Sequence, residues 1–417
     1  MDKINNVMDY ISNLSEIQDL ISLNMNRVLN NHFDLKKITA TCIVLTYNEE
    51  RCIKRCLEHV IGVFDEIIVI DTGSNDYTKE LILEFENKKL KLFDFEWCDD
   101  FSKVRNFGIN QANSDWVIFI DADEIFQIDN KNKLYEILSL LDNVVQKKDI
   151  SLSFEIHEKN TSFIFDDIPR MIYKNGNCKY YGNVHEEIRS SMKKVILIKT
   201  NIVLFHDGYS EKIVSKKSKK KRNILLLNKC IENEPNNLRW YYYYYSRDGI
   251  GFINDIENLK FVESVLDKYE EKFKLENFEH NSGYYFKLIM VYMDLLIKVG
   301  KTNKIEQIIK RYKLDKSNFY DIQFYKFLSK LINLGLEYEL LLKKLFEFRK
   351  DNFERQDSSI SKDGIHIDLL IAVALFETKR YKDSKKYFDF IGDKLDGTID
   401  KKLIDSYRDV INKIESK

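Results

Sequence analysis

The sequence predicts an α/β domain built on a parallel sheet, followed by an all-helical repeat domain. From Thr39 to Ile120, short apolar runs typical of buried strands alternate with amphipathic stretches of helical period. Beyond Lys216 the pattern is helical almost to the end. The 417 residues include only 14 Gly and 2 Pro. That is about 4% against the ~12% of average usage, which favours long, uninterrupted elements.

The first domain is expected to hold four buried strands joined by helices. Continuous apolar strands separated by helices are typical of a parallel sheet that is covered on both faces. The expected strands span 39–46, 66–71, 89–95 and 116–120, and the expected helices span 49–61, 78–86 and 101–112.

Residues 150–210 alternate shorter β-like runs with polar turns, which indicates a mixed or antiparallel extension of the sheet. The runs cover 150–156, 163–165, 171–173 and 195–204.

The second half predicts a short, TPR-like α-solenoid with a period of about 40 residues and two helices per repeat. In most repeats a glycine is expected near the end of the first helix. Aromatic-rich helices are expected to start near Trp240, Tyr284, Asp321 and His366, and the glycines are Gly249, Gly300 and Gly335.

The N-terminal residues 1–36 are polar, with apolar residues at helical spacing, and predict one or two amphipathic helices. This arm is expected either to pack on the body or to mediate self-association. The predicted division is therefore an arm over 1–36, an α/β domain over 37–215 and a helical domain over 216–417.

The composition argues against several classes of protein. The net charge of −1 offers no global field for nucleic acid or an acidic membrane. No apolar run approaches the ~20 residues of a membrane-spanning helix. The six cysteines form no CxxC pair, which is typical of a reduced, cytoplasmic protein.

Polar clusters follow three of the predicted strands, at the edge of a parallel sheet where ligands bind. Thr46, Tyr47, Asn48 and Glu49 follow the first strand and Asp71 ends the second. The segment Asp121-Ala-Asp123 follows the fourth.

The two carboxylates of Asp121 and Asp123 are two residues apart, so in extended backbone both project to one side. Paired carboxylates at a strand end suit Mg²⁺ or Mn²⁺ that is shared with phosphate oxygens. The structural alternative is a solvated turn at the end of the strand.

Three segments together resemble the opening of a family 2 glycosyltransferase: residues 40–50, 69–76 and 119–124. Such enzymes have the GT-A fold, a Rossmann-like domain that binds a nucleotide-sugar, usually a UDP-sugar, and inverts the anomeric centre. Within that family the chain is most similar to bacterial peptide S-glycosyltransferases of the sublancin type. The narrower resemblance is carried by residues 100–106, 182–187, 206–209 and 221–224.

The resemblance implies roles for the residues at the strand ends. Thr46, Tyr47, Asn48 and Glu49 would line the nucleobase and ribose, and Asp71 would hydrogen-bond the uracil or ribose. Arg105 and Asn106 would close over the nucleotide-sugar. Asp121 and Asp123 would hold a divalent metal, Mn²⁺ or Mg²⁺, on the diphosphate, and His206 would complete the metal shell.

An inverting transfer also needs a base on the face opposite the leaving group. Glu186 is the candidate base, and His185 would orient or replace it. Arg222, in a basic segment, would meet the diphosphate; the alternative for such a run is a solvated helix face.

The resemblance implies transfer of a hexose, glucose from UDP-glucose, to a cysteine or serine of a ribosomally made bacteriocin peptide. The repeats would hold the peptide or pair two subunits as a homodimer, and neither nucleic acid nor a membrane span is expected. One alternative is a transferase for a cell-envelope saccharide. Another is a non-catalytic repeat scaffold with a degenerate nucleotide-binding fold.

Overall fold

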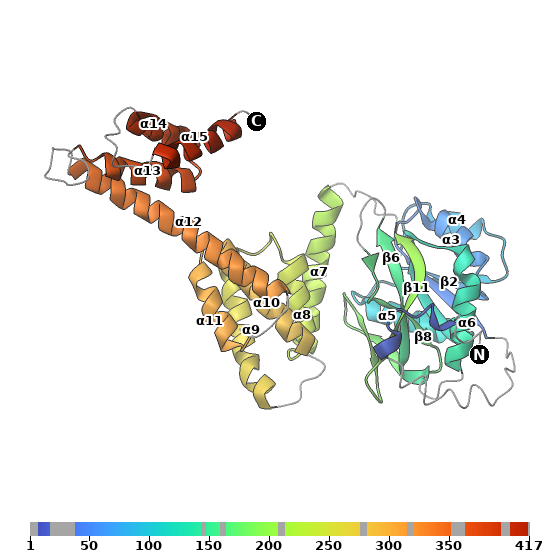
Figure 1. Ribbon diagram of the computed structural model, residues 1–417. Helices are drawn as coiled ribbons and strands as arrows, with labels where there is room; N and C mark the ends of the chain where they lie inside the picture. Colours follow the sequence, from blue (N-terminus) through green and yellow to red (C-terminus); the bar gives the residue numbers. More distant parts are fainter. Residues whose placement is uncertain are drawn as a thin grey trace. The chain divides into compact units, whose positions relative to one another are not determined.

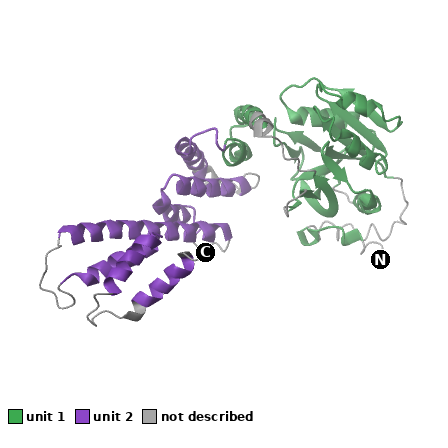
Figure 2. Cartoon of the chain, turned by 90° about the horizontal axis from the view of Figure 1, so that it is seen from above, with its two compact units in different colours: residues 1–249 green, residues 250–417 purple. Residues whose placement is uncertain are grey.

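The computed structural model describes residues 7–16, 38–142, 147–158, 164–206, 213–275, 282–314, 320–351, 363–392 and 401–415 (Figure 1). The chain divides into two compact units, residues 1–249 and 250–417 (Figure 2). The first unit contains the sheet and the first helices beyond it, and the second is helical. The predicted fold class, an α/β domain followed by helices, is confirmed.

The first unit is built on a mixed nine-stranded sheet, whose strands run in the order β3-β2-β1-β4-β8-β6-β11-β5, with β7 beside β6. The four strands at one end are parallel, as the apolar runs predict. They are β1 (Ala40–Thr46), β2 (Glu66–Asp71), β3 (Leu90–Asp94) and β4 (Trp116–Asp121).

The remaining strands extend the sheet with both directions, as the sequence predicts. Strand β8 runs antiparallel to both β4 and β6, whereas β11 runs parallel to β6. Strand β5 and the separate ribbon of β9 and β10 were not predicted from the sequence pattern; these strands are only three or four residues long. The bounds are β5 (Glu124–Phe126), β6 (Ile150–Glu158), β7 (Ile164–Phe165), β8 (Pro169–Tyr173), β9 (Cys178–Tyr181), β10 (Glu187–Ser190) and β11 (Ile196–His206).

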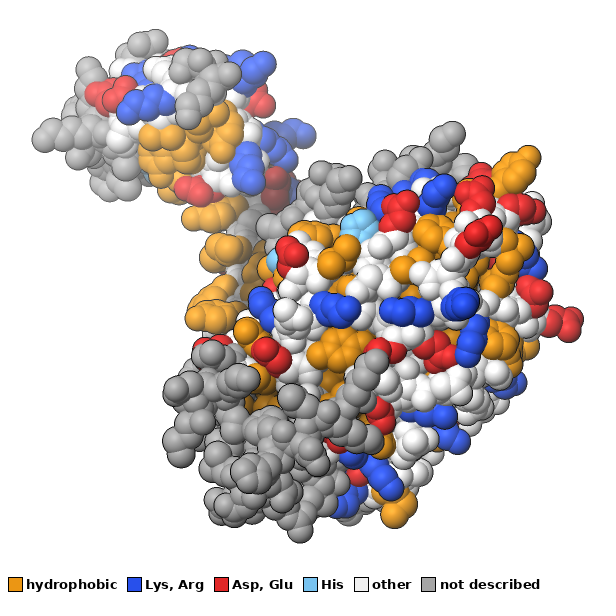
Figure 3. All heavy atoms as spheres, turned by 90° about the vertical axis from the view of Figure 1, so that its right-hand side faces the viewer, with side chains coloured by type: hydrophobic (Ala, Val, Ile, Leu, Met, Phe, Trp, Pro, Cys, Tyr) orange, Lys and Arg blue, Asp and Glu red, His pale blue; other side chains and the backbone are white. Residues whose placement is uncertain are grey.

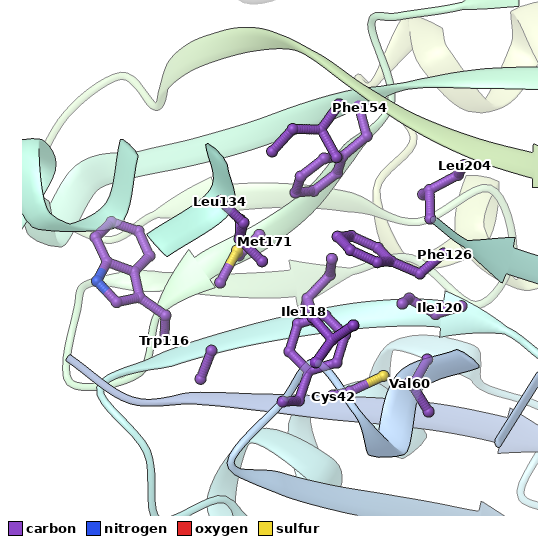
Figure 4. Close-up of a cluster of buried hydrophobic side chains, with 14 of the residues drawn as sticks. Cys42, Val60, Trp116, Ile118, Ile120, Phe126, Leu134, Phe154, Met171 and Leu204 are labelled. Carbon is purple, nitrogen blue, oxygen red and sulfur yellow. The ribbon is translucent and has the colours of Figure 1, made fainter. Parts of the chain in front are cut away.

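Helices cover the parallel strands because alternate side chains of each strand point to opposite faces. On one face, α3 (Ile53–Ile61), α4 (Thr78–Leu83) and α6 (Lys131–Asp142) pack over residues such as Cys42 and Ile118 (Figure 4). On the other face, α5 (Phe101–Gln111) and the β9–β10 ribbon cover Ile43, Ile68 and Phe119. The sheet is therefore buried on both sides.

Residues 7–16, the described part of the N-terminal arm, pack on the body of the first unit. Val7 and Ile11 are buried in its core, and Ile11 forms an isolated bridge with Thr200. The side chain of Asn13 donates to the carbonyl of Leu197 and accepts from the amide of Lys199, so it pairs with β11 much as a strand would. The remainder of the predicted arm lies outside the described residues.

The helices beyond the sheet start where the aromatic residues predict, but one glycine behaves differently. Gly335 does not end a helix, because α12 runs through it without a break, at a cost of about 1 kcal/mol relative to alanine. The helices are α7 (Ile213–Asn233), α8 (Leu238–Tyr243) with a π-turn (Tyr244–Asp248), α9 (Asp255–Leu275), α10 (Ser282–Lys298), α11 (Ile305–Arg311), α12 (Tyr320–Asp351), α13 (Ile365–Glu377), α14 (Tyr381–Gly392) and α15 (Lys401–Glu415).

The described surface carries charges of both signs. On the face shown in Figure 3, Lys and Arg side chains are interspersed with Asp and Glu, and the whole sequence holds nearly equal numbers of the two kinds. Among the described helices, none combines the length and the apolar character needed to cross a membrane.

A buried carboxylate ties the amino-terminal ends of the parallel strands together. Glu66 on β2 accepts hydrogen bonds from Thr41 of β1 (2.7 Å), Lys91 of β3 (2.7 Å) and both the backbone and side-chain amides of Asn113 (2.8 Å each). Burial alone would raise the pKa of Glu66, but these donors outweigh it and lower the pKa to about 2. The charged form of Glu66 therefore stabilises the sheet.

We expect Glu66→Gln to destabilise the first unit by about 3 kcal/mol at pH 7. The pKa of Glu66 is lower in the fold than its ordinary value of 4.5, so this stability is present above pH 4.5 and is lost as the pH falls toward 2. Urea unfolding followed by tryptophan fluorescence measures it, since all three tryptophans lie in residues 1–249.

The matched control is Glu58→Gln on the exposed side of α3, which we expect to change stability by less than about 0.5 kcal/mol. Equal effects of the two substitutions at pH 7, or a loss at Glu66 that does not shrink in acid, would contradict this account.

Candidate functional site at the carboxyl ends of the strands

The ends of β1 and β2 are joined through Asp71, whose side chain is fully buried. One carboxylate oxygen accepts from the amides of Gly73 (3.0 Å) and Ser74 (2.9 Å), and the other accepts from the hydroxyl of Thr46 (3.3 Å). Burial opposes the charged form of Asp71, but the hydrogen bonds and nearby Lys79 prevail and lower its pKa. In this geometry Asp71 shapes the turn after β2 and presents no surface to a ligand, and its predicted contact to a nucleoside stays a prediction.

Hydrogen bonds join the loops that follow these two strands. The amide of Asn48 donates to the hydroxyl of Ser74 (2.8 Å), and the side chain of Asn48 accepts from the amide of Asn75 (2.9 Å). The amide of Glu49 donates to the hydroxyl of Thr78 (2.7 Å). Between the strand and these contacts Tyr47 stands 55% exposed, so its ring is open to a ligand.

Beyond β4 the chain turns, and a buried arginine holds the turn. Arg170 on β8 donates to Asp121 at 3.0 Å and to Glu124 at 2.7 Å. The amide of Asp121 also donates to the carboxylate of Glu124 (2.9 Å), which closes the turn from the other side. Burial raises the pKa of Glu124 to about 7, against the opposing charge of Arg170.

This turn separates the two carboxylates that the sequence placed together. The backbone is not extended through residue 122, so Asp121 faces Arg170 while Asp123 meets His206 at the end of β11. The His206 Nε2 atom lies 3.1 Å from the Asp123 carboxylate, and both side chains are about one-third exposed. The hydrogen bond with Asp123 raises the pKa of His206.

The metal set expected from the sequence is assembled only in part. Within the described residues, no three His, Cys, Asp or Glu side chains are grouped so that they could hold a metal ion. Asp123 and His206 form a pair, whereas the carboxylate of Asp121 is committed to Arg170. The inclusion of Asp121 among the metal ligands therefore finds no support in this geometry.

Arg105, from α5, links the strand end to the loop before β10. Its Nε donates to Glu186 at 2.5 Å, and its Nη2 lies 3.8 Å from Asp121. The guanidinium carbon also lies 5.0 Å from the ring centre of Phe119 and 5.3 Å from that of Tyr180. The Nη1 atom is buried and has no hydrogen-bond partner among the described residues, so this donor is left unsatisfied.

The neighbouring Asn106 has a different function in the fold. Its side-chain amide donates to the carbonyl of Tyr180 (2.8 Å) and accepts from the Tyr180 amide (3.0 Å). This pair of bonds fastens β9 to α5. The predicted closure of Asn106 over a nucleotide-sugar stays a prediction.

Successive residues of the segment 182–187 each contact another part of the first unit. Gly182 has a φ of +103°, and a Cβ there would lie 2.4 Å from the ring of Trp240, so the position requires glycine. The side chain of Asn183 donates to the carbonyl of Asp99 (2.9 Å). Val184 is buried among residues of α7 and against Trp240.

These contacts fix His185, which also has a positive φ of +50°. Its Nε2 atom lies 2.5 Å from the carboxylate of Asp248, and its ring stacks on Tyr243 at 4.2 Å with the planes 8° apart. Asp248 accepts a second hydrogen bond, from Asn223 of α7 (3.1 Å). Burial opposes the charged form of Asp248, but the contact with His185 outweighs it and lowers the pKa of Asp248.

Two residues of this site were missed by the sequence reasoning, Arg170 and Asp248. Asp248 lies in the π-turn, a rare local structure that often marks functional positions. The sequence signals near it are the aromatic-rich helix predicted to start near Trp240 and the glycine, Gly249, expected near its end. Arg170 follows Pro169 at the start of a strand and gave no separate signal.

Arg222 lies on α7, where its side chain is exposed. The guanidinium donates to the side chain of Asn223 and lies 5.2 Å from the ring centre of Phe101 at the start of α5. Since Asn223 contacts Asp248, Arg222 belongs to the same neighbourhood as His185. Its predicted contact with a diphosphate stays a prediction.

Comparisons with known proteins give this geometry a context. Residues 41–192 match the model of a family described as Glycosyl transferase family 2. The SPbeta prophage-derived glycosyltransferase SunS of Bacillus subtilis (strain 168) is 32% identical over 237 residues, which cover 56% of this chain and 54% of that protein. The chain thus spans about half the length of the curated relatives that it matches first.

Other similarities are shorter or more distant. A TPR repeat-containing protein of Synechococcus elongatus is 41% identical over 83 residues, 20% of each chain. Among solved structures, Staphylococcus aureus TarS 1-349 in complex with UDP-GlcNAc is 15% identical with a TM-score of 0.34, covering 72% of this chain and 92% of that one. The mannosyltransferase PcManGT from Pyrobaculum calidifontis, in complex with GDP-Man and Mn²⁺, is 14% identical with a TM-score of 0.36, covering 68% and 96%.

We expect Gly182→Ala to destabilise the first unit by about 3 kcal/mol or more, because the new methyl group adds a collision with Trp240 to the strain of a positive φ. Gly73→Ala is the matched control, since its φ of +101° is nearly the same and no atom of the described residues lies within 4 Å of its Cβ position. Strain alone should cost about 1 to 2 kcal/mol. Equal shifts in the urea midpoint of tryptophan fluorescence would show that the contact with Trp240 is unimportant.

Proposed function

We propose that this chain, whose residues 41–192 form a family 2 glycosyltransferase domain, transfers a hexose from a UDP-sugar, glucose from UDP-glucose, to a cysteine of a peptide. The proposal is carried by the position of the Asp123–His206 pair, and of Arg105 near Asp121, at the carboxyl ends of strands β4 and β11. The peptide acceptor rests on the resemblance to peptide S-glycosyltransferases, and the reducing cytoplasm expected from the cysteines is part of the same proposal.

On the donor side, Asp123 and His206 would hold a divalent cation. Two protein ligands with partly exposed side chains suit Mg²⁺ or Mn²⁺, which take their other ligands from water and substrate phosphates. The ion would stabilise the negative charge that develops on the departing diphosphate. Arg105 would add its free Nη1 donor to a phosphate or hydroxyl oxygen.

On the acceptor side, we assign the base to His185 rather than to Glu186. Glu186 is occupied by the Nε of Arg105, so it positions that side chain. Asp248 holds His185 by Nε2, which leaves Nδ1 to take the proton of the acceptor. A thiol of pKa near 8.5 is already partly ionised at neutral pH, so it depends less on a base than a hydroxyl does.

We expect Asp123→Ala to lower UDP-sugar hydrolysis and transfer by at least about 100-fold and to abolish metal-dependent UDP binding, because one of two cation ligands is lost. Turnover of UDP-glucose and calorimetric binding of UDP with Mn²⁺ measure the two effects. Asp129→Ala, which removes an exposed carboxylate six residues away, should leave both unchanged. Hydrolysis by Asp123→Ala at the wild-type rate would overturn the site.

For the acceptor, we expect intact-mass analysis to show one added hexose on a Cys-containing peptide and little on its Cys→Ser partner. Asp248→Asn should slow transfer to cysteine by about 10-fold at most and transfer to any hydroxyl acceptor by about 10²- to 10⁴-fold, since only the hydroxyl requires full base catalysis. Addition to serine but not to cysteine would reject S-transfer. Equal losses with the two acceptors would remove the base role from His185.

A further inference from the structure

The π-turn that follows α8 closes on a glycine. The amide of Gly249 donates to the carbonyl of Tyr244 (2.9 Å), five residues back, whereas an α-helix bonds to a residue four back. A Cβ atom at Gly249 would lie 2.4 Å from that carbonyl oxygen, which is closer than Cβ atoms approach in proteins. The closed turn therefore requires glycine here, although the φ of Gly249 is an ordinary −76°.

The extra residue of the π-turn brings Asp248 to the side of the helix that carries Arg239 and Tyr243. These two residues are four apart in α8, so they share one side. Asp248 follows five residues after Tyr243, and an uninterrupted α-helix would rotate it about 140° away from that side. Because a π-turn contains five residues where an α-helical turn contains four, Asp248 returns to the side of the other two.

All three of these side chains contact His185. Arg239 donates to the backbone carbonyl of His185 from Nε (3.0 Å) and from Nη2 (2.8 Å). The ring of Tyr243 stacks on the imidazole, and the guanidinium carbon of Arg239 lies 5.0 Å from the centre of the same ring. Asp248 contacts Nε2 of His185. The residue is thus held at its backbone, on one face of its ring and at one ring nitrogen.

The backbone of His185 needs support of this kind. Its φ of +50° lies in the left-handed region, which residues other than glycine seldom adopt. Such a conformation persists only where the surrounding contacts determine it, and it is commonest at functional sites. The contacts from α8 and the π-turn supply that constraint, so the position of the imidazole depends on this helix.

We propose that the π-turn closed on Gly249 is the element that positions the acceptor base, and that Arg239 and Tyr243 are positioning residues that act through His185. The turn determines that Nε2 meets Asp248 and therefore that Nδ1 is the nitrogen left for the acceptor. The effect on catalysis rests on the proposed function, whereas the contacts themselves do not depend on it.

Nitrogen-15 NMR of the histidine side chains tests the geometry in the full chain without any substrate. In the wild type we expect neutral His185 to carry its proton on Nε2, toward Asp248. Gly249→Ala should open the turn, displace Asp248 and give a mixture of both tautomers. The signal is assigned with His185→Gln. An unchanged Nε2 tautomer in Gly249→Ala would overturn the positioning by the turn.

Gly62→Ala is the matched control for that substitution. Gly62 follows α3 with the same φ of −76°, and no atom of the described residues lies within 4 Å of its Cβ position. The added methyl group therefore meets no obstacle, and the tautomer of His185 should stay that of the wild type. A tautomer shift in Gly62→Ala as large as that in Gly249→Ala would show that the π-turn has no special effect.

A double-substitution cycle tests the consequence for transfer. Gly249→Ala should slow transfer to a hydroxyl acceptor by about 100-fold, since a displacement of about 1 Å can cost that much. In a chain that already carries Asp248→Asn it should add less than about 3-fold, because both changes act through one contact. Equal losses in the two backgrounds would overturn the proposal. If Asp248→Asn alone has no effect, the base role of His185 fails, and the NMR result still decides the geometry.

Two substitutions of Tyr243 test the stacking contact. Tyr243→Phe keeps an aromatic ring beside His185 and should keep the Nε2 tautomer and most of the rate, whereas Tyr243→Leu should slow hydroxyl transfer by about 10-fold. Equal effects of the two would remove the positioning role from this ring. If circular dichroism shows that Gly249→Ala does not fold, this pair of variants decides the proposal in its place.

Discussion

The carboxyl edge of the sheet depends on one buried arginine that donates hydrogen bonds to two carboxyl groups. Arg170 holds Asp121 at the end of β4 and Glu124 at the start of β5, and Glu124 is almost wholly buried. Removing one partner of such a group leaves an uncompensated buried charge, at a cost of about 3 to 5 kcal/mol. Because the turn between these strands is fixed in this way, Asp123 is directed toward His206 instead of following Asp121.

The other side chains of the candidate site are held by contacts between residues that lie far apart in the sequence. Arg105 from α5 meets Glu186, and His185 beside it meets Asp248 at the end of the π-turn. Each of these side chains is therefore positioned by a partner rather than left in solvent. Positioned groups need little reorganisation during a reaction, which is why such an arrangement suits catalysis.

The strands and helices could be predicted from the sequence because buried elements carry apolar residues at regular spacing. β2 has the predicted bounds, and helices α8, α10, α12 and α13 start within two residues of the predicted positions. Gly335 shows the limit, since packing carries α12 through a residue of poor helix propensity. The contacts of Arg170 with Glu124 and of Asp248 with His185 could not be predicted from the local sequence. Their partners lie 46 and 63 positions apart, and only the fold brings them together.

In the proposed function, the carboxyl edge of the sheet binds the diphosphate of a nucleotide-sugar through a cation held by Asp123 and His206. A crystal structure with UDP and Mn²⁺, using the anomalous signal of manganese, tests this binding mode. We expect one anomalous peak within about 2.3 Å of both the Asp123 carboxylate and the His206 ring, in contact with the diphosphate. A peak elsewhere with UDP bound, or a nucleotide away from this edge, would contradict it.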